Sequence, residues 1–275
     1  MTVRIAPDRG AIKIAMWSGP RNVSTAMMRA FENRDDTGVT DEPFYAAFLA
    51  RTGDIHPMRD EVIASQPTDW RDVAAAMQGE GPGPPVWYQK QMCHHMLPEF
   101  GLDWMDSCTN AFLIRPPEQV LASYRAKRTM VTLSDIGVVR QNEIFDREAD
   151  RLGHAPPVIE GSDILADPER ALTALCAALG IRFSEKMLSW PAGRRASDGV
   201  WAPAWYDAVD RSTRFTAPVR VARFEDLPDT LKPVADAARP YYQRMAKFRL
   251  ALWPPAATRR SSPRRTRQPD WRRGR

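Results

Sequence analysis

Short apolar runs recur along the first 180 residues, and a turn or a polar segment ends each of them. The run at 11–17 (AIKIAMW) carries β-branched residues and stops at the turn Ser18-Gly19-Pro20, so it predicts a buried strand. The same reasoning predicts four more strands, at 39–40, 86–92, 111–114 and 158–160. Runs of this length with few polar positions are typical of a sheet that is covered on both faces.

Helical patterns separate the predicted strands. Ser24 opens a helix after the first strand, the segment 52–78 is largely helical, and a helix is expected over 118–128 after two prolines. A further helix begins at the cap residue Asp167. Strands that alternate with helices predict an α/β fold, a parallel β-sheet flanked by helices on both faces.

The composition fits one globular domain with a basic tail. Of 275 residues, 43% are hydrophobic and 27% are charged, which excludes fibrous and wholly disordered chains. The net charge is +5, yet residues 251–275 hold eight arginines and one acid, so 31 basic and 33 acidic residues remain elsewhere. We predict a single α/β domain over 1–255 and a disordered Arg/Pro/Ser-rich tail over 256–275. Because the body lacks basic stripes, no specific nucleic-acid partner is expected.

The sequence also limits compartment and metal chemistry. No window approaches the ~18 apolar residues of a transmembrane helix, and the opening MTVRIAPDRG has no apolar run, so we expect a cytoplasmic protein without a membrane span. Cys93, Cys108 and Cys176 are odd in number and far apart, which predicts reduced thiols and no four-cysteine zinc site. No metal site is predicted, and the sequence does not determine the oligomeric state.

The loop after the first strand has the parts of an anion-binding site. Backbone N–H groups at the start of the next helix point outward, Ser24 and Thr25 supply hydroxyls, and Arg21 supplies a fixed charge. The loop is not a Walker A motif, because Ser24 replaces its second Gly and Thr25 replaces its Lys. This disfavours a magnesium-dependent kinase. A capped helix beside a solvated Arg is the alternative interpretation.

A second candidate anion site follows the fourth predicted strand. Arg115 ends that strand, and Ser123 lies eight residues later, two turns into the next helix. Both can reach the carboxyl edge of a parallel sheet, where open α/β folds bind ligands. A guanidinium and a hydroxyl together suit a phosphate group.

These two segments resemble the motifs of sulfotransferases that use 3′-phosphoadenosine 5′-phosphosulfate (PAPS). The run SGPRNVST resembles the family's 5′-phosphosulfate loop, with Arg21 where many members have Lys, and RPPEQVLAS resembles its 3′-phosphate motif. The segment 159–168 is similar to the family's strand, acidic turn and D-P helix start. The resemblance implies a P-loop-like sulfotransferase architecture with PAPS as co-substrate. It assigns nucleotide binding to Ser18, Gly19, Arg21, Asn22, Val23, Ser24, Thr25, Arg115 and Ser123.

The implied reaction is an in-line, metal-independent transfer of a sulfuryl group to a small hydroxyl or amine acceptor. It needs positive charge on the leaving phosphate, a role that falls to Arg21, and a base for the acceptor's proton. Glu42, in D-E-P-F, is similar to the Glu in the E-P turn of carbohydrate and bacterial sulfotransferases. His94 and His95 resemble the K-x-H-L-P segment of the cytosolic branch, in which Lys90 matches the Lys.

We favour Glu42 as the base and keep His94 and His95 as alternatives. A Glu base predicts a rate that rises through an acidic pKa, and a His base one that rises near ~6.5. The other histidines, His56 and His154, are expected in loops.

Three features stay open at this point. The family's Gly-rich cover of the nucleotide is not clearly present; the segment from Gly193 to Trp201 is its candidate, with a surface loop as the alternative. The acceptor pocket is expected in the loops 46–85, 129–150 and 190–215, which do not reveal the acceptor. A catalytically silent protein that binds the desulfonated nucleotide is the alternative function.

Overall fold

The computed structural model describes residues 11–125 and 131–252. The strands are β1 (Ile12–Ser18), β2 (Thr37–Asp41), β3 (Val86–Met92), β4 (Thr109–Ile114) and β5 (Val158–Glu160). The α-helices are α1 (Ser24–Glu32), α2 (Tyr45–Thr52), α3 (Arg59–Ser65), α4 (Trp70–Gln78), α5 (Pro117–Arg125), α6 (Val138–Leu152), α7 (Gly161–Ala166), α8 (Pro168–Ala178), α9 (Ala202–Trp205), α10 (Asp207–Asp210) and α11 (Lys232–Ala246). Short 3₁₀ helices are η1 (Cys93–His95), η2 (Asp103–Ser107), η3 (Glu185–Leu188) and η4 (Phe224–Asp226).

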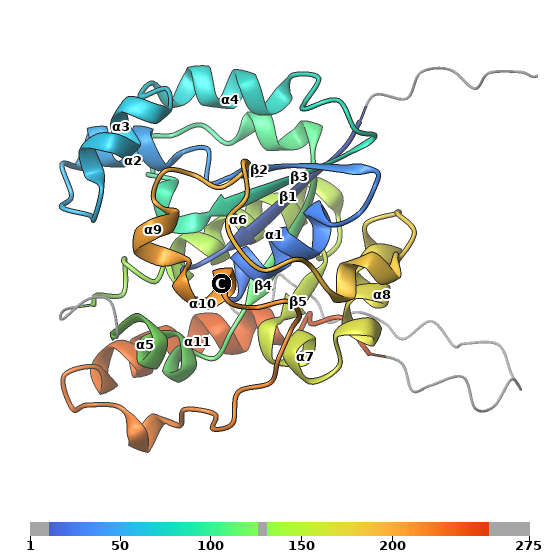
Figure 1. Cartoon of the computed structure of the whole chain (residues 1–275). Coiled ribbons are helices and arrows are strands. Elements are labelled where there is room, and N and C mark those ends of the chain that lie inside the picture. Colours follow the sequence, from blue (N-terminus) through green and yellow to red (C-terminus); the bar gives the residue numbers. More distant parts are fainter. Residues whose placement is uncertain (1–10, 126–130, 253–275) are drawn as a thin grey trace, which may run out of the picture.

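The five strands form one parallel sheet in the order β2-β3-β1-β4-β5, with β1 at its centre (Figure 1). All five predicted strands are confirmed, and β2 is longer than the two residues expected. Ser18 at the end of β1 lies beside Met92 of β3 and Leu113 of β4. The carboxyl ends of the three central strands are therefore level, so the loops that follow them meet at one edge of the sheet.

Alternating side chains of β1 divide the core into two layers. Ile14 and Met16 pack in one cluster with residues of α1 and α8, while Ala15 and Trp17 pack in the other with residues of α4 and α6. All four side chains are fully buried, as expected for a strand covered on both faces. The predicted parallel sheet with helices on both faces is confirmed.

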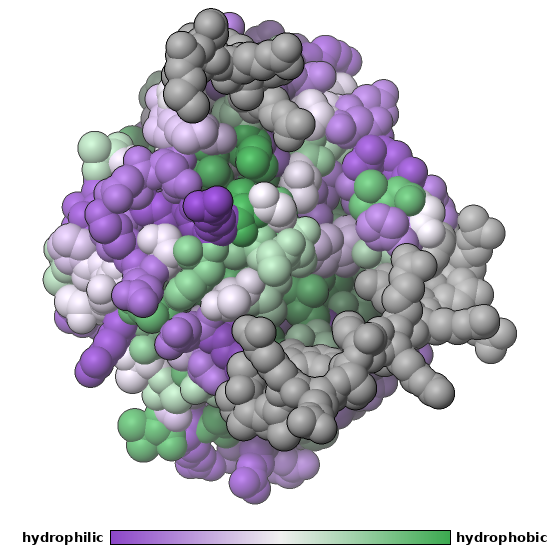
Figure 2. All heavy atoms as spheres, turned by 90° about the vertical axis from the view of Figure 1, so that its right-hand side faces the viewer, coloured by the Kyte–Doolittle hydropathy of each residue, from purple (hydrophilic) through white to green (hydrophobic). Residues whose placement is uncertain are grey.

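One face of the molecule shows how polar and apolar side chains are distributed over the surface. On the face shown in Figure 2, hydrophilic residues cover much of the described surface and hydrophobic ones form small areas between them. None of the helices described is long and apolar enough to cross a membrane. Cys93, Cys108 and Cys176 are buried free thiols.

Two predicted features lie partly or wholly outside the described residues. The helix expected over 118–128 is described to Arg125, and the tail expected over 256–275 is not described. The division of the chain into a domain over 1–255 and a tail therefore stays a prediction.

Candidate active site

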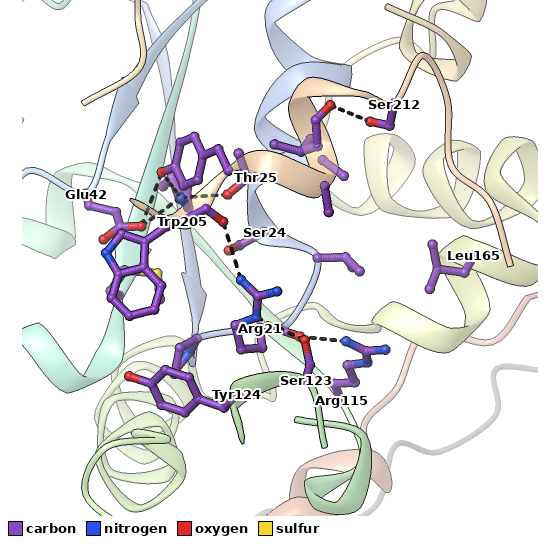
Figure 3. Close-up of a pocket in the computed structure, with 18 of the residues that line it drawn as sticks. Arg21, Ser24, Thr25, Glu42, Arg115, Ser123, Tyr124, Leu165, Trp205 and Ser212 are labelled. Carbon is purple, nitrogen blue, oxygen red and sulfur yellow. Dashed lines mark hydrogen bonds and ion pairs between the residues drawn. The ribbon is translucent and has the colours of Figure 1, made fainter. Parts of the chain in front are cut away.

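A pocket of about 320 Å³ opens at the carboxyl edge of the sheet. Its lining comes from the loop between β1 and α1, the ends of β2, β3 and β4, helix α5, and the segment 205–216. Because β3 and β4 flank β1 on opposite sides, the connections diverge there, and ligands bind at such points in open α/β sheets. Figure 3 shows Glu42 at one end of the pocket, Arg115 and Ser123 at the other, and Arg21 between them.

The predicted nucleotide loop divides into residues that face the pocket and residues that hold the loop. Arg21, Val23, Ser24 and Thr25 line the pocket. Three other predicted binding residues do not line it, namely Ser18, Gly19 and Asn22.

Those three residues pack into the body of the protein. The buried Ser18 hydroxyl donates to the Met92 sulfur at 3.6 Å, and the Asn22 amide donates to the Leu113 carbonyl at 3.3 Å. A Cβ on Gly19 would lie 2.3 Å from the Ile136 carbonyl oxygen, so only glycine fits at this position without a shift. Ser18 and Asn22 therefore support the loop through their side chains, and any contact they make to a nucleotide must use backbone groups.

Backbone strain is concentrated at this pocket. Among the described residues, four non-glycine residues have a positive φ, and three of them line the pocket: Arg21 (60°), Val23 (56°) and Glu42 (40°). A left-handed conformation is especially unfavourable for a β-branched residue such as Val23. Strain of this kind persists where surrounding contacts fix it, and it is common at functional sites.

The two candidate anion motifs meet in one cluster. Arg21 Nε donates to Ser123 Oγ at 3.0 Å, and Arg115 Nη1 donates to the Arg21 carbonyl oxygen at 2.7 Å. Ser123 thus joins the first motif to the second, although the sequence analysis paired it with Arg115 alone. Arg21 Nη1 also lies 3.5 Å from the Trp205 carbonyl oxygen.

Within the described part of the chain, no carboxylate lies within ion-pair distance of Arg21 or Arg115. Burial lowers the pKa of both guanidiniums, and the charge of Arg21 lowers that of Arg115 further. Both groups remain charged near neutral pH, because an arginine stays protonated in proteins. Two adjacent, half-buried cations beside the uncapped N-terminus of α1 fit the phosphate groups of a nucleotide.

The opposite end of the pocket is built around a buried ion cluster. Lys90 Nζ lies 2.8 Å from Glu42 Oε1 and 3.0 Å from Asp41 Oδ1. Lys90 and Asp41 are each 1% exposed at the side chain, whereas Glu42 is 11% exposed and lines the pocket. Of the two carboxylates, Asp41 and Glu42, a ligand can therefore reach Glu42.

The cluster changes the acidity of its members. Burial raises the pKa of Glu42, and Asp41 raises it further, against the opposing effect of Lys90. Burial alone would lower the pKa of Lys90, but the two carboxylates outweigh it and raise that pKa. Lys90 is therefore charged at neutral pH, and Glu42 takes up a proton more readily than an exposed glutamate.

The histidines occupy different places around Glu42. His95 Nδ1 lies 4.0 Å from Glu42 Oε2, and burial together with neighbouring cations and histidines lowers the His95 pKa well below its usual value. His94 is half-buried and lines the pocket. His56 lies in a loop as predicted, but it is buried and lines the pocket, with its Nδ1 2.8 Å from the Tyr45 hydroxyl. His154 is not among the lining residues.

With this geometry established, similarity to known proteins identifies the family. Residues 12–249 match the sulfotransferase domain family. The chain belongs to this family. Among solved structures, the fold of this chain is similar to the sulfotransferase domain from the curacin biosynthetic pathway (TM-score 0.50, 14% identity, covering 84% of this chain and 99% of that one). It is also similar to a sulfotransferase from Alicyclobacillus acidocaldarius (TM-score 0.51, 10% identity, covering 87% and 96%).

Two Arabidopsis thaliana proteins are more similar in sequence. They are named branched-chain-amino-acid aminotransferase-like protein 1 and protein 2, and they are 36% identical over 215 residues and 35% identical over 209 residues. The matches cover 76% and 74% of this chain but only 38% and 36% of the relatives. The chain thus spans well under half of each relative's length.

The segment after residue 200, which lies in the loop 190–215 expected to contribute to the acceptor pocket, supplies further site residues. Trp205 and Tyr206 line the pocket, and the Tyr206 hydroxyl donates to Asp41 Oδ2 at 2.7 Å. The expected cover from Gly193 to Trp201 does not line the pocket. Asp198 from that segment is instead paired with Arg29 at 2.6 Å, and Trp201 is buried in the core. The aromatic composition of 201–206 was the available signal, but it does not distinguish a core residue from a pocket residue.

Among the residues described, no group of three or more His, Cys, Asp or Glu side chains could hold a metal ion.

Removal of the buried ammonium group should destabilise the protein strongly. In Lys90→Met, Asp41 and Glu42 are left as uncompensated buried carboxylates, which costs about 3–5 kcal/mol in the free energy of unfolding at pH 7. Burial raises the pKa of Glu42, so protonation of Glu42 can relieve part of this cost in the folded variant, and the loss relative to wild type should shrink at pH 5. Denaturant unfolding at both pH values measures the difference.

Lys186→Met is the matched control, because the Lys186 pair with Asp35 is exposed on both sides and contributes at most about 1 kcal/mol. A loss below that of the control, or an equal loss at both pH values, would contradict the assignment of Lys90 as the counter-ion of two buried carboxylates.

Proposed function

We propose that the protein transfers a sulfuryl group from PAPS to a small hydroxyl or amine acceptor. The observation that carries the proposal is the division of one pocket into an arginine end and a carboxylate end, with Arg21 and Arg115 at the first and Glu42 at the second. Transfer between two bound substrates needs both ends in one cavity, because the anionic donor and the acceptor's proton require opposite charges. Membership of the sulfotransferase family supports the reaction class.

The arginine end would bind the donor nucleotide. Arg115 and Ser123 suit its 3′-phosphate, and Arg21 with the N–H groups at the start of α1 suits the 5′-phosphosulfate. These are the roles that the sequence motifs imply. The guanidiniums already share a hydrogen-bonded cluster, so binding requires little rearrangement of their positions.

The carboxylate end would serve the acceptor. Glu42 Oε1 is engaged by Lys90, whereas Oε2 faces His95 at 4.0 Å and makes no shorter polar contact among the described residues. Oε2 is thus the atom that can accept the acceptor's proton while the new bond to sulfur forms and the bond from sulfur to the phosphate oxygen breaks. A raised pKa suits Glu42 for this role, because a base works best with a pKa near the working pH.

The cations next to the phosphosulfate site would stabilise the leaving phosphate. Arg21 lies in the loop itself, and Lys90 Nζ lies 3.0 Å from Thr25 Oγ1 at the start of α1. A sulfuryl group carries less negative charge than a phosphoryl group, so protein cations can meet this need without a metal ion.

Incubation of the protein with sulfur-labelled PAPS and a small-molecule extract of cells tests the function. We expect label to pass from PAPS to an acceptor, with release of the desulfonated nucleotide. Tight binding of that nucleotide without any transfer across acceptor classes would contradict the proposal and favour a silent nucleotide-binding protein.

Loss of Arg115 should weaken binding selectively. Arg115→Ala should cost roughly 1.5–3 kcal/mol in binding of 3′-phosphoadenosine 5′-phosphate, the range for a hydrogen bond to a charged group. Adenosine 5′-phosphosulfate lacks the 3′-phosphate, so its binding should change far less. Calorimetry with both nucleotides measures the selectivity, and Arg51→Ala, at an exposed arginine outside the pocket, is the control. An equal loss for both nucleotides would count against the assignment.

Loss of the Glu42 carboxylate should abolish most turnover. Glu42→Gln should lower kcat by about 10²–10⁴-fold and leave nucleotide affinity unchanged, because the variant keeps the side chain's shape but cannot take a proton. Glu99→Gln, at an exposed glutamate, is the control. Steady-state kinetics and nucleotide binding measure the two effects.

The pH profile supports this test but does not replace it. Wild-type kcat should rise with pH through a pKa above the usual value for glutamate, since Glu42 must be deprotonated. The pKa of Glu42 is raised and the pKa of His95 is lowered, which brings the two pKa values closer together. A pH profile alone therefore does not tell which of the two residues is the base. Near-full activity of Glu42→Gln together with an inactive His95→Ala would transfer the role to His95.

A further inference from the structure

The hydroxyl of Tyr206 lies inside the ion cluster at the carboxylate end of the pocket. The residue is 4% exposed and follows helix α9 directly, far in sequence from Asp41 and Lys90. We propose that Tyr206 is a positioning residue for the sulfuryl transfer: its hydroxyl fixes Asp41 and Lys90 so that Glu42 is left as the carboxylate that receives the acceptor's proton. The proposal rests on the proposed function and adds a residue to it.

Every hydrogen-bonding capacity of this hydroxyl is used. It donates its one hydrogen to Asp41 Oδ2 at 2.7 Å, with Glu42 Oε1 as a second, longer acceptor at 3.4 Å. It accepts from Lys90 Nζ at 2.6 Å and from the indole Nε1 of Trp201 at 3.0 Å. A phenol has one hydrogen and two acceptor positions, so its orientation is determined by three partners on three separate parts of the chain.

The hydroxyl also gives Asp41 a hydrogen-bond donor that Glu42 shares only at a longer distance. Lys90 Nζ has four oxygen neighbours, on Thr25, Asp41, Glu42 and Tyr206, but only three hydrogens. Because Tyr206 and the backbone N–H of Gly199 both donate to Asp41 Oδ2, that carboxylate does not depend on Lys90 alone. Lys90 can then keep its 2.8 Å contact with Glu42 Oε1, which leaves Oε2 on the side of His95.

Loss of the hydroxyl should alter Glu42 directly, because the 3.4 Å contact with Oε1 is lost, and also through the neighbours of Glu42. Without the Tyr206 donor, Asp41 competes more strongly for Lys90, and the negative charge beside Glu42 is less compensated. Both changes make it harder to remove the proton from Glu42. The groups that face Glu42 are Asp41 on the same strand end, Lys90 of β3, His95 of η1 and Tyr206, with His94 and His56 next to His95.

Tyr206→Phe isolates the hydroxyl. The ring, whose centre lies 4.6 Å from Lys90 Nζ, is retained, and Arg21 and Arg115 have no side-chain contact with the lost oxygen. Tyr242→Phe is the matched control, because Tyr242 also donates to a carboxylate, Glu160 Oε2 at 3.1 Å, but lies outside this pocket.

The expected result is a change in kcat and its pH dependence with little change in nucleotide affinity. For Tyr206→Phe, the acidic limb of the kcat profile should move to higher pH by about one unit, the scale of one lost hydrogen bond to a charged group. Nucleotide KM should stay within about twofold, whereas a loosened fold would weaken both parameters. Tyr242→Phe should leave both unchanged.

A measurement that does not depend on catalysis tests this proposal separately from the proposed function. Carbon-13 NMR of glutamate carboxyl groups, assigned with Glu42→Gln, should show a higher titration midpoint for Glu42 in Tyr206→Phe than in wild type. If wild type transfers no sulfuryl group, the proposed function fails, and this titration still tests the coupling. An unchanged midpoint or an unchanged pH profile in a folded variant overturns the positioning role.

If Tyr206→Phe does not fold, the double variant Tyr206→Phe/Trp201→Phe is used for the same titration. It removes the indole donor that the single change leaves buried without a partner, and paired removal of both polar groups is better tolerated than removal of one. The same upward shift is expected, and its absence in the folded double variant overturns the proposal.

Discussion

One buried ammonium group, that of Lys90, is the constraint on which the rest of the site depends. It is 1% exposed and within 3.0 Å of oxygens on Thr25, Asp41, Glu42 and Tyr206. These contacts connect β3 to the end of β2, to the start of α1 and to the segment after α9. A buried cation is tolerated only when such partners surround it, so its presence requires the carboxylates to lie where they do.

The parallel sheet places the Lys90 cluster at one end of the pocket and the two arginines at the other. Because the ends of β1, β3 and β4 are level, the loop that carries Arg21 and the strand end that carries Arg115 lie at the same edge as the Lys90 cluster. Among the described residues, no carboxylate lies within ion-pair distance of Arg21 or Arg115, although Asp207 acts on Arg21 from farther away. These two cations therefore face one half of the cavity, and a reachable carboxylate, Glu42, faces the other. This arrangement suits an anionic donor and a proton-releasing acceptor. Family membership accounts for the fold, whereas the proposed reaction rests on these side chains.

The sequence predicted those parts of the molecule that local patterns determine. The predicted bounds of β3 match the structure at both ends, because an apolar run between two turns indicates a buried strand. Motif spacing singled out Arg21 and Arg115 as binding candidates, and both line the same pocket. The Ser18 and Asn22 side chains proved to support the loop, since a motif does not reveal which way a side chain points. The link between Tyr206 and Asp41 spans 165 positions, and no local pattern encodes a contact at that separation.

A crystal structure of the protein with 3′-phosphoadenosine 5′-phosphate tests most directly the claim that one pocket has a donor end and an acceptor end. We expect the 3′-phosphate to contact Arg115 and Ser123, and the 5′-phosphate to contact Arg21 and the first turn of α1. An open space should remain between the 5′-phosphate and Glu42 Oε2. A nucleotide that is bound elsewhere on the protein, or that lies across Glu42 and Lys90 with its phosphates away from both arginines, would contradict this claim.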